Sequence, residues 1–147
     1  MDSLRVTELE RRLGYRFRDP LLLEQALTHT SYANEHPPAA DHERLAFLGD
    51  AALALVVAEH VTAADPAAPV GVLTPRRAEL VAGGRLARWA VELALGPLLR
   101  LGRGEDQSGG RTRESILATA LEAVLGAIYR EAGLGAVRDV IGRLAAW

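Results

Sequence analysis

The sequence predicts an all-α fold. Apolar residues recur at helical spacing in several long segments, and no segment alternates with period two over a useful length. The clearest pattern lies in residues 43–57, E-R-L-A-F-L-G-D-A-A-L-A-L-V-V, where the apolar residues of one helical face are Leu45, Leu48, Ala52, Leu55 and Val56. A chain of 147 residues is long enough to bury a core of its own. We therefore expect one domain over residues 1–147, with no internal repeat.

The first elements follow from local signals. Residues 6–13 form a short amphipathic helix that ends at Gly14. Asp19 and Pro20 predict the start of a helix that reaches residue 27, since proline is favoured at the first helical position. The run His36-Pro37-Pro38 predicts a loop, and the long helix of residues 43–57 should begin near His42.

The middle of the chain is less regular. Residues 63–69 form an Ala/Pro loop, which we expect to be the least ordered internal segment. Thr74-Pro75 predicts the start of another helix. The apolar period of this helix continues across Gly83-Gly84, so we expect one helix that ends at Gly96-Pro97.

The last third contains one long helix and one shorter one. A short helical turn is expected at residues 98–101, followed by a glycine-rich polar loop at 102–113. The long helix covers residues 114–132, and Gly133 fits its C-cap. An amphipathic helix over 135–146 closes the chain.

Composition narrows the class of protein. The chain has no cysteine, no run of eighteen apolar residues and no signal-peptide pattern, so we expect a soluble, cytoplasmic protein without disulfides, thiol-based metal sites or a membrane partner. A net charge of −2 argues against a general polyanion binder. The segment from Arg76 to Arg113, however, contains eight arginines and only four acidic residues. That local excess suits either a phosphate backbone or a solvated face in a protein whose basic residues are all arginine.

One carboxylate stands out in the apolar run of residues 43–57. Burying an unpaired carboxylate costs several kcal/mol, so Asp50 needs a cation, a hydrogen-bond network or a metal. A capped or salt-bridged Asp50, with Gly49 allowing close helix packing, is the simpler interpretation. Glu122 presents the same problem in the apolar part of the helix at 114–132.

A divalent cation held between Asp50 and Glu122 would solve both problems. Oxygen ligands of this kind suit Mg²⁺ or Mn²⁺, and Mg²⁺ keeps several waters, so few protein ligands suffice. Glu43 lies on the same helical face as Asp50, but about 10 Å along the helix axis, too far to share one ion comfortably.

Four segments resemble ribonuclease III. E-R-L-A-F-L-G-D-A-A-L (43–53) is similar to the family signature, usually E-R-L-E-F-L-G-D-S-V-L. Residues 13–35, 71–81 and 101–129 resemble its other blocks, in the family's order and over essentially the whole chain. The resemblance implies the all-helical endonuclease domain of ribonuclease III, which dimerises and cleaves double-stranded RNA with Mg²⁺ activating water for attack on a phosphodiester.

The acidic site departs from the family pattern. The four carboxylates usual in the family fall on Ala46, Asp50, Thr119 and Glu122, so two of the four are missing. A further acidic position is Val70 here. Mini-ribonuclease III is a short branch of the family without a double-stranded-RNA-binding domain. It has a similar small residue at the position of Ala46 and a similar threonine at the position of Thr119.

The resemblance gives two alternative functions. The first is a divalent-metal-dependent endoribonuclease, a homodimer without a double-stranded-RNA-binding domain, that acts in RNA processing such as ribosomal RNA maturation. It would use Mg²⁺, with Mn²⁺ as a substitute. The second is a catalytically silent domain that binds structured RNA or a ribonucleoprotein. Members of the fold family that serve only as structural proteins are known.

Each candidate residue has an expected role. Asp50 and Glu122 would hold the metal, and Glu43 would assist from beyond the metal's direct ligands or by ordering water. Phe47 would enter a cavity of the second subunit, its plain alternative being core packing. The four histidines show no ligand spacing, and we interpret them as structural or surface residues. The candidate RNA contacts are Arg76, Arg77, Ser108, Arg111 and Arg113.

Overall fold

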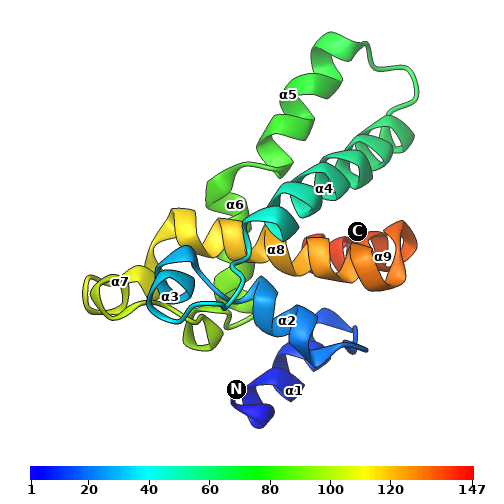
Figure 1. Ribbon diagram of the computed structural model, residues 1–147. Helices are drawn as coiled ribbons and strands as arrows, with labels where there is room; N and C mark the ends of the chain where they lie inside the picture. The colour runs from blue at the N-terminus through cyan, green and yellow to red at the C-terminus, as the bar shows by residue number, and fades with distance from the viewer.

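The computed structural model describes residues 1–147 and is all-helical, as predicted (Figure 1). Two residues outside the helices, Thr28 and Arg100, form an isolated parallel bridge, and there is no strand. The element order is α1 (Ser3–Leu13), α2 (Pro20–Ala26), α3 (Thr30–Glu35), α4 (Glu43–Ala64), α5 (Val70–Leu80), α6 (Gly83–Glu92), η1 (Gly96–Leu98), α7 (Arg103–Gln107), η2 (Gly110–Thr112), α8 (Glu114–Ala132) and α9 (Leu134–Ala145).

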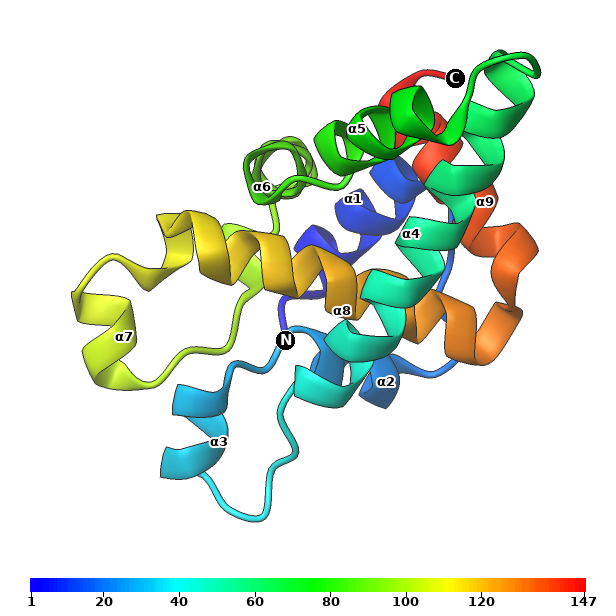
Figure 2. The ribbon, with the colours of Figure 1, turned by 90° about the horizontal axis from the view of Figure 1, so that it is seen from above.

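Helix α8 is the centre of the core. Eleven of its nineteen residues are buried, and α2, α4, α6 and α9 all pack against it. Its most extensive contact is with α4, which crosses it as Figure 2 shows. The crossing is close because two glycines face the partner backbone. A Cβ at Gly49 would lie 1.7 Å from the Glu122 carbonyl oxygen, and one at Gly126 would lie 1.9 Å from that of Leu45.

Several helix starts and stops that carry clear signals are confirmed. Gly14, in the left-handed region with φ 67°, ends α1 as predicted, but α1 begins at Ser3, three residues before the predicted start, because the Asp2 carboxylate caps it there. Asp19 caps α2, with Pro20 in its first turn. The bounds of α8 agree with the predicted residues 114–132, and α9 begins one residue before the predicted start.

Three predictions about the less regular segments are wrong. The predicted polar loop 102–113 contains the short helix α7, which lacks an apolar period because it buries no residue. Helix α3, in a segment for which no element was predicted, likewise buries no residue. α5 begins at Val70, directly after Pro69, rather than at Thr74-Pro75, so Pro75 lies inside it. The chain breaks at Val81 and Ala82, and Gly83 opens α6, because the extended backbone of Ala82 starts a new helix there.

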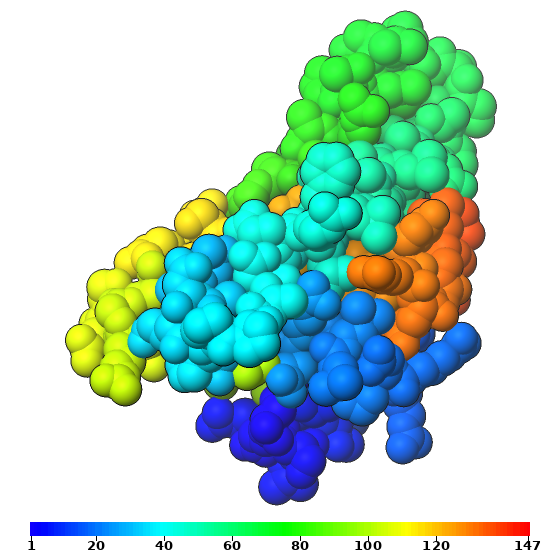
Figure 3. Space-filling model, in the orientation of Figure 1, coloured from blue at the N-terminus to red at the C-terminus, as the bar shows by residue number.

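The outer half of α4 and all of α5 form an arm that rises from the body (Figure 3). α5 buries no residue, and it contacts the rest of the molecule mainly through α4. By length and composition α4 could cross a membrane, but eight of its residues are buried in the fold, as expected of a core helix. Leu55, assigned to its buried face from the sequence, is exposed, because it lies on the outer face of α4 whereas Val56 and Val57 turn into the core.

Candidate active site

The α4–α8 crossing brings Asp50 and Glu122 together from two different helices, as predicted. Gly49 precedes Asp50, and its missing side chain lets the α4 backbone reach the Glu122 backbone. The two carboxyl groups lie close enough for Asp50 to perturb the ionisation of Glu122. Burial, the hydrogen bond to Asp50 and the negative charge of Asp50 raise the pKa of Glu122 to about 8. At neutral pH the Glu122 carboxyl therefore keeps its proton.

Asp50 is more exposed than its apolar surroundings in the sequence predict. Asp50 is exposed and Glu122 is half-buried, so the expectation that both carboxylates lie in buried surroundings is wrong for Asp50. Asp50 sits at the edge of the crossing, on the side of α4 that faces solvent. The pair is therefore open on one side, which a hydrated ion or a phosphate group requires.

No third acidic group or histidine completes a metal-binding cluster here. Ala46 is buried and offers no ligand. Thr119 is half-buried, and its Oγ1 donates to the Ser115 carbonyl oxygen at 2.9 Å. The site consists of two carboxylates, as the departures from the family pattern indicate.

Glu43 lies apart from this pair, at the first turn of α4. Thr30 Oγ1 lies 3.3 Å from Glu43 Oε1 and 3.1 Å from Asp41 Oδ2. The backbone N–H of Glu43 donates to Asp41 Oδ1 at 3.1 Å. Asp41 and Thr30, which the sequence analysis did not single out, thus hold Glu43 at the junction of α3 and α4.

Two histidines adjoin this junction. The rings of His29 and His42 meet edge-on with centroids 5.6 Å apart. His42 is 2% exposed, and its Nδ1 is buried without a hydrogen-bond partner. Burial lowers the pKa of both rings. Only His36 and His60 have appreciable solvent access besides His29, so the interpretation of the histidines as structural or surface residues agrees with their positions.

The candidate RNA contacts divide into two groups. Arg77 is exposed, and Arg76 is exposed but pairs with Asp65 at 3.2 Å. Arg111 is half-buried, and it donates to the carbonyl oxygens of Gly96 and Leu99 and to Asp106. Those bonds favour a structural role for Arg111. Its contact with phosphate stays a prediction, as do those of the other four residues.

Arg113 and Ser108 belong to the same turn. Arg113 pairs with Glu105 and donates to the Ser108 carbonyl oxygen at 3.0 Å. Ser108 is exposed at the end of α7. The polar groups of this turn bind one another, so a phosphate group would have to compete with Glu105 for Arg113.

Phe47 does not pack in the core. Its side chain is 83% exposed on the outer face of α4. A cavity of about 720 Å³ lies beside it and is lined by Glu43, Arg44, Leu45, Phe47, Leu48, Tyr129 and Arg130.

The family follows from the whole chain. A family model described as Ribonuclease-III-like matches residues 19–146. The chain belongs to the ribonuclease-III-like family. The ribonuclease 3 of Enterococcus faecalis is 46% identical over 143 residues, and that of Oleidesulfovibrio alaskensis is 51% identical over 135 residues. These matches cover 96% and 91% of this chain but 62% and 59% of the relatives, so the chain spans about three fifths of their length.

The fold agrees with solved nuclease domains of the family. Two structures of the nuclease domain of ribonuclease III from Campylobacter jejuni each superpose with a TM-score of 0.89, at 40% and 39% identity. They cover 95% and 98% of this chain, and each is itself covered to 94%. One of them describes structural flexibility in a region involved in dimer formation. The ribonuclease-III-like chain thus has the extent of a nuclease domain.

Proposed function

We propose that this chain is a divalent-metal-dependent endoribonuclease domain that cleaves double-stranded RNA as a homodimer. The observation that carries the proposal is the open Asp50–Glu122 pair at the α4–α8 crossing of a ribonuclease-III-like fold. The ribonuclease 3 names of its relatives support the reaction type. We place the protein in the cytoplasm, in RNA processing.

The carboxylate pair fits a divalent cation. Glu122, which keeps its proton beside Asp50, would offer its carboxyl oxygens to an ion that replaces that proton. Asp50 and Glu122 would hold Mg²⁺, which tolerates few protein ligands because it keeps its waters, and Mn²⁺ accepts the same ligands. When bound, the cation would supply an activated water and neutralise charge on the phosphodiester.

The remaining residues would position the substrate. Glu43 is too far along α4 to ligate the same ion, and it would order water next to the scissile phosphate from its anchor on Thr30. Arg76 and Arg77 lie on the exposed arm, where a duplex could reach them. Ser108, Arg111 and Arg113 would contact phosphate only after giving up their bonds within the turn.

The dimer would form across the outer face of α4. Phe47, Ala51 and Leu55 are exposed at successive turns of that face. The cavity beside Phe47 has room for an aromatic ring from a second copy. Pairing two copies there would bury this apolar face and place two carboxylate pairs on one assembly.

A second function has a specific observation in its favour. The site has two carboxylates where the family pattern has four, and no cluster of three ligands. A protein with so sparse a site could bind structured RNA or a ribonucleoprotein without cutting it. The two functions differ in one measurable property, namely metal-dependent cleavage of a duplex.

The test is cleavage of a long RNA duplex over a series of Mg²⁺ and Mn²⁺ concentrations. We expect cleavage that requires high metal concentration and is stimulated by Mn²⁺. Asp50→Asn and Glu122→Gln should each abolish it. Glu59→Gln is the matched control, because Glu59 is another α4 carboxylate whose partner is Arg138. It should leave cleavage unchanged.

Restoring the missing carboxylates gives the second arm of the test. Ala46→Glu combined with Thr119→Asp should lower the metal concentration needed for cleavage. If the parent cuts no duplex at any metal concentration and the restored variant gains nothing, the silent RNA-binding function replaces the enzymatic one.

A further inference from the structure

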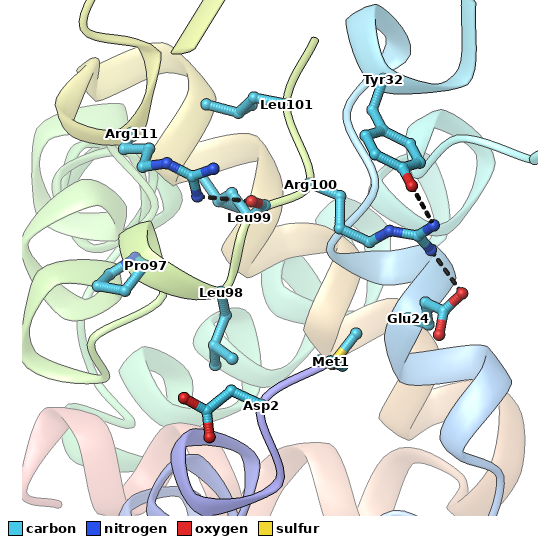
Figure 4. Close-up of a pocket in the computed structure, with 10 residues that line it drawn as sticks. All are labelled: Met1, Asp2, Glu24, Tyr32, Pro97, Leu98, Leu99, Arg100, Leu101 and Arg111. Carbon is cyan, nitrogen blue, oxygen red and sulfur yellow. Dashed lines mark hydrogen bonds and ion pairs between the residues drawn. The ribbon is translucent and has the colours of Figure 1, made fainter. Parts of the chain in front are cut away.

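Helix α3 is held by polar contacts alone. None of its six residues is buried. Ser31 Oγ accepts the Gly102 N–H at 2.8 Å, and the Tyr32 hydroxyl accepts a hydrogen bond from Arg100 at 2.9 Å. Arg100 in turn pairs with Glu24 (Figure 4). Because α3 contributes no buried residue to the core, the polar contacts at its ends and the Arg100 guanidinium over the Tyr32 ring largely decide whether it stays in place.

The N-terminal end of α3 is capped by a histidine ring. His29 Nδ1 accepts the backbone N–H of Ser31 at 3.1 Å, and it lies 2.8 Å from Ser31 Oγ. A backbone N–H can only donate, so Nδ1 must carry a lone pair and the ring proton must sit on Nε2. Since Ser31 Oγ already accepts from Gly102, its own hydrogen points to Nδ1. Protonation of Nδ1 would remove the capping bond from the Ser31 N–H, and the Ser31 hydroxyl would have to turn and accept from the ring instead.

The C-terminal end of α3 has the opposite requirement. His36 Nδ1 lies 3.0 Å from the Tyr32 carbonyl oxygen, which can only accept, so this ring donates. The His36 ring also stacks on Tyr32 with centroids 4.0 Å apart. A protonated His36 keeps its bond, whereas a protonated His29 loses its cap.

The groups that face His29 are few. The carboxylates of Glu43 and Asp41 favour its protonated form, while burial and the guanidinium of Arg113 oppose it. The ring of His42 packs edge-on against the His29 ring, and burial favours the neutral form of His42 as well. Burial is the largest of these influences and lowers the pKa of His29 below its usual 6.5. The cap is therefore complete at neutral pH and is lost as pH falls from about 6.5 through the lowered pKa.

We propose that His29 is a pH-sensitive cap, which in its neutral form docks α3 on the segment before α7 and on the start of α4, and which releases α3 on acidification. The release weakens the hold of Ser31 on Gly102 by letting α3 move, and it loosens Thr30, whose hydroxyl contacts Asp41 and Glu43. Figure 1 shows α3 beside α7, the two elements that would separate. The proposal concerns the fold of this segment and does not depend on cleavage of RNA.

The experiment is NMR of the full chain between pH 7.5 and pH 5. The readouts are the hydrogen-exchange protection of the Ser31, Tyr32 and Ala33 amides, all of which bond to His29, and the nitrogen shift of the His29 ring. In the wild type we expect protection to fall about fivefold to tenfold, the effect of a lost cap, as the ring becomes protonated. A wild type that keeps its protection to pH 5 would overturn the proposal.

Three variants assign the effect to one ring. In His29→Asn an amide oxygen caps α3 at every pH, so protection should not depend on pH. His36→Asn should behave like the wild type. His42→Phe should also behave like the wild type, since the His42 side chain makes no capping bond.

Two outcomes of the variant series contradict the proposal. One is a pH-dependent loss that persists in His29→Asn, and the other is a loss that disappears in His42→Phe. If His29→Asn does not fold, the ring-nitrogen shift of the wild type decides alone. A His29 ring that is protonated above pH 6.5 while Ser31 stays protected would then reject the cap.

Discussion

The proton on Glu122 links the chemistry of the site to the stability of the fold. Glu122 projects from the central helix, and Asp50 faces it from the helix that crosses there. A neutral carboxyl can hydrogen-bond to a carboxylate, but two charged groups repel each other. A metal ion and a proton are thus alternative ways to satisfy the same pair, and pH decides between them.

The first prediction concerns this proton. The pKa of Glu122 is raised from 4.5 to about 8, so the native state holds a proton that the unfolded state has lost. Stability should therefore fall as pH rises from 4.5 to 8. We would measure the free energy of unfolding in urea without metal at pH 5 and at pH 8.5. Between these two pH values the free energy of unfolding of the wild type should fall by about 1–2 kcal/mol more than that of Glu122→Gln, allowing for the partial solvent access of Glu122. Equal losses in the two proteins would contradict it.

The second prediction concerns Ala94, which follows α6 with φ 56°, in the left-handed region. Its neighbour Leu95 donates to the Ala90 carbonyl oxygen at 3.0 Å, as in a helix C-terminus that favours glycine. Ala94→Gly should stabilise the protein by about 0.5 kcal/mol. Glycine relieves the strain of the left-handed backbone, and this gain exceeds the extra conformational entropy that glycine loses on folding. Ala78→Gly, in the exposed α5, should instead cost about 0.5–1 kcal/mol by thermal or urea unfolding.

At the scale of elements, the α4–α8 crossing depends on the absence of two side chains. Gly49 and Gly126 meet the backbone of the opposite helix at distances that no Cβ can occupy. Their backbone dihedrals are ordinary helical ones, so space rather than conformation requires glycine here.

The third prediction tests that crossing. Gly126→Ala should cost more than about 3 kcal/mol, because the clash is with the carbonyl oxygen of Leu45 rather than with a movable side chain. Gly71→Ala is the matched control, since Gly71 lies in a helix with nothing near its Cβ position. It should gain about 0.5–1 kcal/mol from helix propensity. Urea unfolding of both variants would show whether the crossing tolerates a methyl group.

The sequence predicts the buried helices well and the surface helices poorly. α8 follows from its apolar period because it is surrounded by other helices, the end of α1 follows from Gly14, and the start of α2 follows from Asp19 and Pro20. α3 and α7 bury nothing, so no period reveals them, and they depend on partners distant in the sequence, such as Arg100 and Glu35.

The candidate site could be predicted in part for the same reason. Asp50 and Glu122 can be recognised from the sequence alone, because each is a single carboxylate in an apolar run. The junction around Glu43 cannot, because Thr30, Asp41 and His29 become its neighbours only when α3 folds back on α4. The Thr-His-Thr-Ser run of residues 28–31, rich in capping residues, was the one available signal for α3.

At the scale of the whole molecule, one face remains without a partner. Phe47 is the most exposed large apolar residue, and it stands beside its own cavity. The proposed dimer gives that face a function, and it would also set the separation of the two carboxylate pairs.

The fourth prediction tests this face. Phe47→Glu should weaken self-association by about tenfold or more, as expected for an aromatic anchor, and should leave the fold intact because Phe47 contributes little to the core. Leu21→Glu, on the exposed side of α2, is the control and should associate like the wild type. Sedimentation velocity at micromolar concentration measures both. A wild type that is monomeric there would remove the basis for the prediction.

The crossing of α4 and α8 also bears on how fast the chain folds. Helical proteins usually fold quickly because their contacts join near neighbours in the sequence. Here the central contact joins Leu45 to Gly126, so most of the chain must be looped before the core can close. Folding should therefore be slower than in a bundle of similar size. Asp50 and Glu122 meet only in chains that have completed that step, so an incompletely folded chain has no pair with which to hold a metal ion.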